Sequence, residues 1–159
     1  MDETAVRDQL RKSLGWGEAH ADWKAALKEF PAKLRGAKPK GAPYSPWELL
    51  EHARLAQWDI LEFSRDPKHV SPDFPSGYWP KTAAPPSSAA WDKSVKAFFH
   101  DLGELQALVT DPKADLLAPI PGGSGQTLLR EALLVLDHSS YHLGQIVLLR
   151  RILGAWSAS

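Results

Sequence analysis

The chain has 159 residues with 19 basic and 19 acidic side chains, so its formal net charge at pH 7 is zero. This length suits one domain, expected to extend over residues 1–159, and the balanced charge argues against a nucleic-acid partner. The absence of cysteine excludes disulfides and a protein-borne thiol nucleophile, and it fits a reducing compartment. Because no uninterrupted apolar run is long enough to span a membrane, we expect a cytoplasmic protein with no membrane partner.

A first helix is predicted from about residue 4 to Phe30. Its apolar side chains recur at intervals of three and four residues, which places them on one helix face. Pro31 is expected to end or kink this helix, because proline does not fit a helix interior. The predicted face contains Trp16, His20, Trp23, Leu27, Phe30 and Leu34.

A second helix is predicted from Ser45 to about Ser64. Ser45 can cap the helix, Pro46 suits its first position, and Glu48 can complete a capping box. The dipeptide Asp66-Pro67 then ends it. One face of this helix contains Leu49, His52, Ala53, Ala56, Ile60 and Phe63.

The following segment, residues 66–86, contains six prolines and is predicted to be a long loop. Its aromatic side chains Phe74, Tyr78 and Trp79 are expected to be packed against the protein. Long ordered loops often form a lid or a wall of a binding site, which makes this segment a candidate for either.

Two further helices are predicted, from Ser87 or Ser88 to about Val109 and from Thr127 to about Leu153. The glycines of the connector between them favour a turn over a phosphate site, because no strand precedes them and no Lys-Ser/Thr pair follows. No segment alternates as a strand would. We therefore predict an all-α protein, a four-helix bundle with long Pro-rich connecting loops.

The last helix carries the most specific pattern, His138 and His142 spaced four apart, which stacks both rings on one helix face. His52 lies on the apolar face of the second helix. Each ring alone is more typical of a hydrogen-bonded core histidine. One divalent ion, however, satisfies all three nitrogens at once, and it keeps open positions typical of a catalytic site.

Several other polar residues are candidates for the same site. We expect His20 to act as a proton shuttle or substrate contact, or to be a core histidine bonded to a carbonyl; ligation is the least favoured role. Gln145 orients a ligand ring or a metal-bound water, or bonds a neighbouring helix. Asp59 and Glu51 are candidates for orienting a ligand, with a solvated or surface-paired role favoured for Glu51.

Other polar and aromatic residues near these helices are not expected to belong to the metal site. We expect His69 and His100 to be exposed, and Tyr141 and Asp137 to have surface or packing roles. Gly144 lowers helix stability by about 1 kcal/mol relative to alanine, which favours a close approach of another helix or another subunit at that position.

Four segments of the chain carry a family resemblance. They are SPWELLEH around His52, DHSSYHLGQIVLLRRILGAW around His138 and His142, and the shorter GWGEAHADW and SGYWP. Together they resemble the DinB-like superfamily, including its YfiT-type metal-dependent hydrolases and low-molecular-weight-thiol transferases. The resemblance implies that one histidine of the second helix and two of the fourth bind a divalent metal, roles that fall on His52, His138 and His142.

The resemblance also implies the chemistry. The ion, Zn or Ni first and Fe as a further candidate, would activate water for hydrolysis or a thiol such as glutathione, bacillithiol or mycothiol for transfer to a small-molecule substrate. It implies a homodimer as well, for which the apolar surface near Trp156 is a candidate. The alternative function is a non-catalytic bundle that keeps the ion for stability or binds a small molecule.

Overall fold

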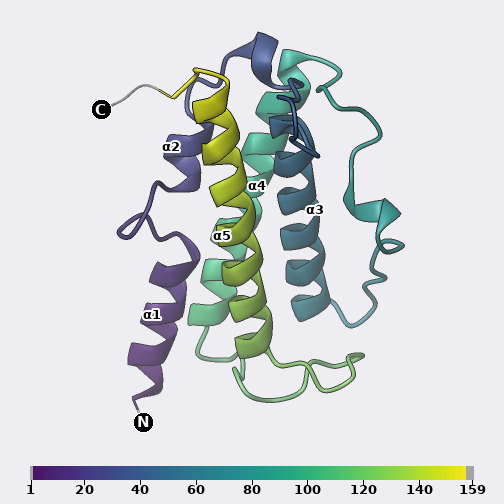
Figure 1. Cartoon of the computed structure of the whole chain (residues 1–159). Coiled ribbons are helices and arrows are strands. Elements are labelled where there is room, and N and C mark those ends of the chain that lie inside the picture. The colour runs from purple at the N-terminus through teal and green to yellow at the C-terminus, as the bar shows by residue number, and fades with distance from the viewer. Residues whose placement is uncertain (1, 157–159) are drawn as a thin grey trace.

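The computed structural model describes residues 2–156, which form a bundle of helices without strands. Figure 1 shows α5 at the front, α3 beside it and α4 behind, with α1 and α2 in one column on the other side of α5. The prediction of an all-α bundle is confirmed. The α-helices of this described part are α1 Glu3–Leu14, α2 Trp23–Leu27, α3 Pro46–Arg65, α4 Ser88–Thr110 and α5 Leu128–Ile152, with short 3-10 helices η1 Ala32–Leu34 and η2 Ser76–Tyr78.

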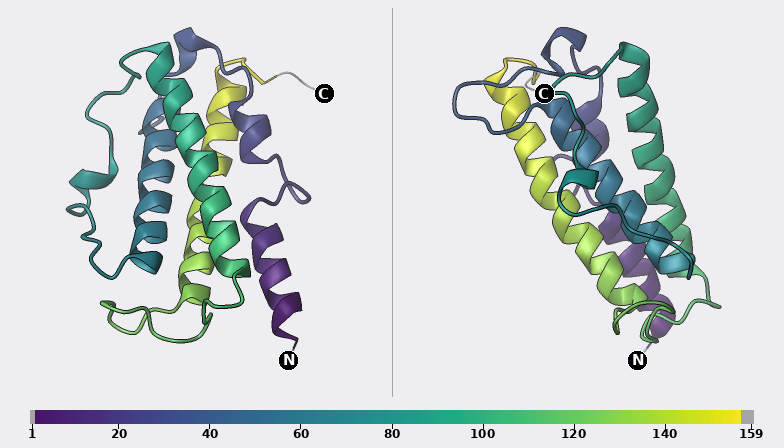
Figure 2. Two further views of the ribbon diagram at one scale, coloured as in Figure 1. Left: turned by 180° about the vertical axis from the view of Figure 1, so that it is seen from behind. Right: turned by 90° about the vertical axis from the view of Figure 1, so that its right-hand side faces the viewer.

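The direction of the helices explains the length of the Pro-rich loop. α3 and α4 run in the same direction, whereas α1, α2 and α5 run in the opposite one, as Figures 1 and 2 show. The 20 residues of α3 span about 30 Å, so the chain must return over that distance before α4 begins. Residues 66–87 make this return, and η2 lies within it.

The prediction of one helix from residue 4 to Phe30 is wrong. α1 ends at Leu14 with Gly15 as its C-cap, and α2 begins at Trp23 after Asp22, whose carboxylate accepts a hydrogen bond from the backbone N–H of Ala25 at 2.7 Å. Glycine favours the end of a helix and aspartate favours its start, so these local signals outweigh the apolar periodicity. The periodic side chains after the break, Trp23, Leu27 and Phe30, are nevertheless buried.

The other three helices begin where their capping residues predicted. Ser45 and Glu48 form the expected capping box at the start of α3. Ser87 caps α4 and Thr127 caps α5, each through its side-chain oxygen. None of the described helices is both long and apolar enough to cross a membrane.

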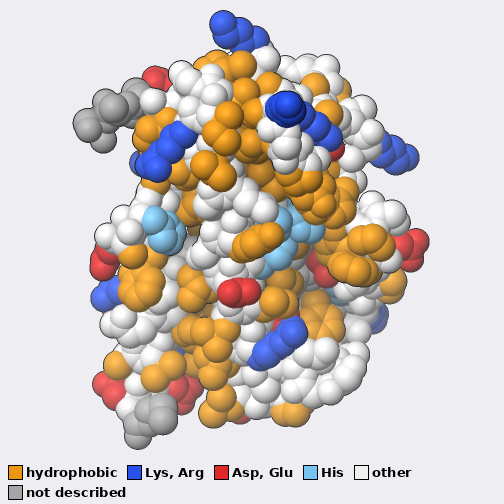
Figure 3. Space-filling model, viewed as in Figure 1, with side chains coloured by type: hydrophobic (Ala, Val, Ile, Leu, Met, Phe, Trp, Pro, Cys, Tyr) orange, Lys and Arg blue, Asp and Glu red, His pale blue; other side chains and the backbone are white. Residues whose placement is uncertain are grey.

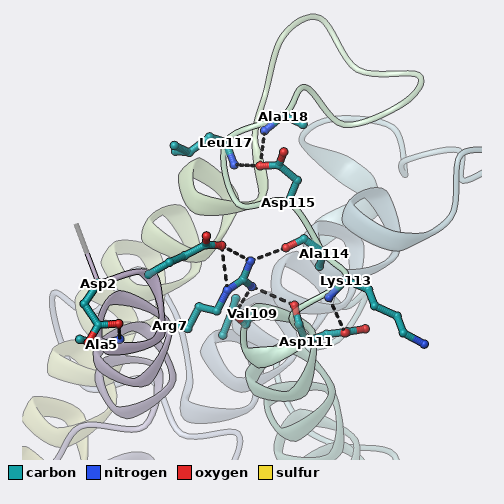
Figure 4. A network of polar contacts seen from close by, with 11 residues as sticks. Asp2, Ala5, Arg7, Val109, Asp111, Lys113, Ala114, Asp115, Leu117 and Ala118 are labelled. Atoms are coloured by element: carbon teal, nitrogen blue, oxygen red, sulfur yellow. Dashed lines mark hydrogen bonds and ion pairs between the residues drawn. The ribbon is translucent and has the colours of Figure 1, made fainter.

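Two buried arginines attach α1 and α2 to the rest of the bundle. Arg7 donates hydrogen bonds to the carbonyls of Val109 and Asp111 at the end of α4 and of Ala114 in the connector that follows. Figure 4 shows its guanidinium between α1 and these carbonyls. Arg150 of α5 likewise donates to the carbonyls of Ala25 and Ala26, both in α2. Such side chains satisfy backbone acceptors that helix ends leave without partners.

Candidate metal centre

His52 of α3 meets His138 and His142 of α5 in the seam between the two helices. One ring nitrogen from each residue forms a group in which all three atoms lie within 4.8 Å of one another. Nε2 of His138 lies 3.1 Å from Nε2 of His52, and the ring centroids of His138 and His142 are 4.5 Å apart. We call these residues the three-histidine cluster. The structure thus brings together the three residues that the sequence singled out.

Hydrogen bonds fix the orientation of two rings of the cluster. Nδ1 of His52 donates to the carbonyl oxygen of Tyr78 at 2.9 Å, and Nδ1 of His142 donates to Oε1 of Gln145 at 2.8 Å. An imidazole that donates through Nδ1 keeps the lone pair of Nε2 free in its neutral form. Both rings are therefore prepared to bind a metal through Nε2, with the outer hydrogen bond typical of metal-bound histidine.

All three rings are held in the neutral form. Burial lowers the pKa of His52 and of His142, and burial together with the neighbouring His142 and His52 lowers the pKa of His138 to about 4. Because a metal ligand must be unprotonated, this environment favours cation binding near neutral pH.

The lowered pKa of His138 predicts that the metal-free protein loses stability in acid. Between the unfolded pKa of 6.5 and the folded pKa of about 4, the unfolded chain binds more protons, so stability falls as the pH falls through this interval. For His138 alone we expect a loss of about 2 kcal/mol between about pH 7 and about pH 5. Urea unfolding of chelator-treated protein at both pH values measures this loss. A free energy of unfolding that does not change would contradict the burial of a neutral ring.

The Pro-rich loop forms one wall of the centre. Trp79 stacks on His52 with 3.9 Å between ring centroids and an angle of 3° between the planes, and Tyr44 stacks on Trp79 at 4.2 Å. The right-hand view of Figure 2 shows the loop crossing α3 beside α5. In Figure 3, histidine side chains reach the surface in the seam between α5 and α3, next to hydrophobic ones. The expectation that Phe74 is packed is wrong, because its side chain is 87% exposed.

Asp59 acts on the loop and not on a ring of the cluster. Its carboxylate accepts a hydrogen bond from the Tyr78 hydroxyl at 2.7 Å and pairs with Nε2 of His69 at 2.7 Å. Burial and this carboxylate raise the pKa of Tyr78 to about 12, which keeps the phenol protonated as a donor. Asp59 thereby holds the residue whose carbonyl orients His52. The expectation that His69 is exposed is wrong, since this pairing leaves its side chain 9% exposed.

The geometry of the cluster fits a divalent cation. Nitrogen ligands lie about 2.0 to 2.1 Å from zinc, so tetrahedral ligands are about 3.4 Å apart. Nε2 of His52 and Nε2 of His138 are 3.1 Å apart, and no two of the three ligand nitrogens are more than 4.8 Å apart. Small side-chain movements would therefore bring all three to the tetrahedral spacing. Three neutral nitrogens leave further coordination positions to other ligands.

The hydrogen bond between His142 and Gln145 predicts how substitutions of Gln145 change the affinity for the metal. Gln145→Met removes the acceptor for Nδ1 of His142, whereas Gln145→Glu keeps an acceptor at that position. We expect the methionine variant to bind Zn²⁺ about 10- to 100-fold more weakly and the glutamate variant to retain the affinity. Competition with a chromophoric chelator measures both values. Equal affinities for the two variants would show that this hydrogen bond does not orient the ring.

The remaining candidates lie away from the three-histidine cluster. His20 is exposed in the loop between α1 and α2, where Nδ1 donates to the carbonyl of Ala21 at 2.9 Å. It lines a separate cavity of about 220 Å³ with Trp16, Trp23 and Phe99. The structure therefore does not bring His20 to the cluster, and its exposure contradicts the alternative of a core histidine.

Glu51, His100 and Gly144 were also assigned expected positions from the sequence. Glu51 pairs with Arg54 at 2.8 Å, but it is buried, so the expectation that it lies on the surface is wrong. His100 is exposed, as predicted. Gly144 has no close helix neighbour, because a Cβ placed there would meet no atom within 4 Å. The expectation of a close helix approach within the chain is wrong, and packing of a second subunit at Gly144 stays a prediction.

Sequence reasoning missed two parts of the site. The carbonyl of Tyr78 and the ring of Trp79 both contact His52 from the loop. The aromatic residues among the prolines were the available signal, since they predicted a packed wall without assigning it to a ring.

Comparison with known proteins supports the same conclusion about the family. The model of the family described as the DinB superfamily matches residues 16–146, which include all three histidines of the cluster. No match was found among curated proteins or among solved structures.

Proposed function

Because this chain belongs to the DinB superfamily, we propose that it is a metal-dependent enzyme whose divalent ion is held by His52, His138 and His142. The observation that carries the proposal is the convergence of three neutral ring nitrogens from two helices within 4.8 Å of one another. Nδ1 of His52 and Nδ1 of His142 already have acceptors, and one cation would satisfy the ring nitrogens that converge on the opposite side. Zn²⁺ and Ni²⁺ are the first candidates and Fe²⁺ a further one, since imidazole suits each of them.

The ion would supply Lewis acidity, which lowers the pKa of a coordinated water and makes a coordinated thiol lose its proton without a base. Hydrolysis and transfer of a low-molecular-weight thiol are the two reaction classes that this chemistry allows. Hydrolysis usually also needs a general base in contact with the reacting group. A coordinated thiol ionises more readily than coordinated water and does not need such a base, which makes thiol transfer the first reaction to test.

The side chains around the cluster bind and orient and do not themselves react. Gln145 and the Tyr78 carbonyl hold the rings of His142 and His52. Trp79 covers one face of His52 and excludes water from it. Pre-organisation of this kind lowers the cost of binding a cation and keeps its remaining positions directed to the substrate.

This proposal is tested by measuring activity with the metal bound and after the metal has been removed. Protein purified without an affinity tag is loaded with Zn²⁺ or Ni²⁺ and assayed for thiol conjugation to monobromobimane and for ester and amide hydrolysis. We expect one of these activities to disappear with a chelator and to return with the ion. The exposed His100→Ala substitution should leave it unchanged.

Two outcomes would contradict the proposal. Activity that persists after complete metal removal would exclude the metal-dependent mechanism. Stoichiometric metal without activity in any assay would favour the alternative, a non-catalytic bundle that keeps the ion for stability.

A further inference from the structure

An apolar cavity of about 290 Å³ adjoins the candidate metal centre. Its walls are residues 40–44, which precede α3, together with Leu49 of α3 and the stretch of α5 that follows Gln145. This volume is close to the lower limit of small-molecule sites, roughly 300 Å³. The cavity therefore has room for one small chemical group.

Two residues belong to both the cavity and the surroundings of the metal centre. Gln145 lines the cavity and accepts the hydrogen bond from Nδ1 of His142 at 2.8 Å. Tyr44 lines the cavity and stacks on Trp79, which stacks on His52. The two sites thus share walls on both the α5 side and the loop side.

The chemistry of the cavity selects an uncharged group. Leu49, at 1% exposure, is a buried part of the wall, whereas Leu148 and Ile152 are each 59% exposed at the open side. Among the described residues that line the cavity, Lys40 alone carries a charge. Burying apolar surface against these side chains is favourable. A cationic group would lose its hydration there without an acidic partner, and Lys40 is exposed, so its ammonium is paired with water and not with the cavity floor.

We propose that this cavity binds an apolar group of the substrate, so that the substrate is a small amphiphile whose polar end reacts at the three-histidine cluster and whose aliphatic or aromatic end lies against Leu148 and Ile152. The inference rests on the proposed function, because it assigns the cavity to the substrate of that same centre. It adds the substrate class and two residues that determine specificity.

A series of 1-alkylimidazoles tests the proposal through binding, without an activity assay. The imidazole ring is a metal ligand, and straight chains of increasing length from methyl to octyl probe the cavity over a range of distances. Calorimetric titration of Zn²⁺-loaded protein should show affinity that rises with chain length, by at least about tenfold from methyl to the longest chain that fits.

Two matched substitutions on α5 separate the cavity from general surface hydrophobicity. Leu148→Asp places a carboxylate at the open side of the cavity, and it should abolish the increase with chain length. Leu133→Asp changes a similarly exposed leucine on α5, 48% exposed and outside the cavity lining, and it should keep the increase. Both variants should bind 1-methylimidazole as the unsubstituted protein does.

The results distinguish failure of this inference from failure of the proposed function. Binding of 1-methylimidazole without any gain from longer chains, or an equal gain in both aspartate variants, would overturn the cavity proposal alone. Absence of 1-methylimidazole binding to the loaded protein would overturn the open metal centre and the cavity proposal together. A dimer that Leu148→Asp converts to a monomer would assign this face to a second copy of the chain and overturn the substrate assignment.

Discussion

The His138→Ala variant is expected to lose stoichiometric binding of Zn²⁺. Nε2 of His138 lies 3.1 Å from Nε2 of His52, so this substitution removes one of three converging ligands and leaves an incomplete set. Loss of a residue that merely orients a ligand weakens metal binding about 10- to 100-fold, and loss of the ligand itself should exceed about 100-fold. Equilibrium dialysis with elemental analysis measures the stoichiometry, and chelator competition measures the affinity.

The variant should remain folded, which keeps this test interpretable. Burial lowers the pKa of His138, so removing the ring also removes a group whose protonation opposes folding in acid. His100→Ala is the matched control, because this histidine is exposed and lies outside the three-histidine cluster. One equivalent of tightly bound metal in His138→Ala would contradict the assignment of His138 as a ligand.

Arg7→Met is expected to lower the free energy of unfolding by about 3 kcal/mol. The guanidinium of Arg7 is buried and donates to three carbonyls, those of Val109, Asp111 and Ala114, as Figure 4 shows. Methionine keeps the aliphatic packing but removes all three donors. The carbonyl of Asp111 keeps the backbone N–H of Ala114, whereas those of Val109 and Ala114 lose the donor that Arg7 provides, where water has little access. Urea denaturation measures the change.

Arg11→Met provides the matched control on the same helix. The Arg11 side chain is 45% exposed and pairs with Asp8 on the surface, so its loss should change stability by less than about 0.5 kcal/mol. Equal effects of the two substitutions would show that the contacts of Arg7 with α4 do not hold α1 in place.

The sequence predicted the helices whose starts carry a side-chain cap. Ser45, Ser87 and Thr127 each accept a hydrogen bond from the first turn of α3, α4 or α5, and such residues are recognisable without tertiary information. The break between α1 and α2 was missed because Trp23, Leu27 and Phe30 continue the apolar period. Periodicity reports which side chains face the core, and it does not show whether the backbone between them is continuous.

The three histidines were predictable because their spacing and their place on apolar faces are properties of single helices. Their surroundings were not, because these depend on how the returning loop packs. The carbonyl that orients His52 belongs to the backbone of Tyr78 and has no signature in the sequence. His69 is held against the protein by its contact with Asp59, which lies ten residues earlier in the chain. No helical or loop pattern in the sequence predicts this contact.

Anomalous X-ray scattering from a crystal of the metal-loaded protein tests the central claim most directly. With Zn²⁺ we expect one strong peak at the absorption edge of the ion, about 2.0 to 2.1 Å from Nε2 of His52, His138 and His142. A peak bound by other residues, or three rings that each keep a separate hydrogen-bond partner with no peak between them, would contradict the metal centre.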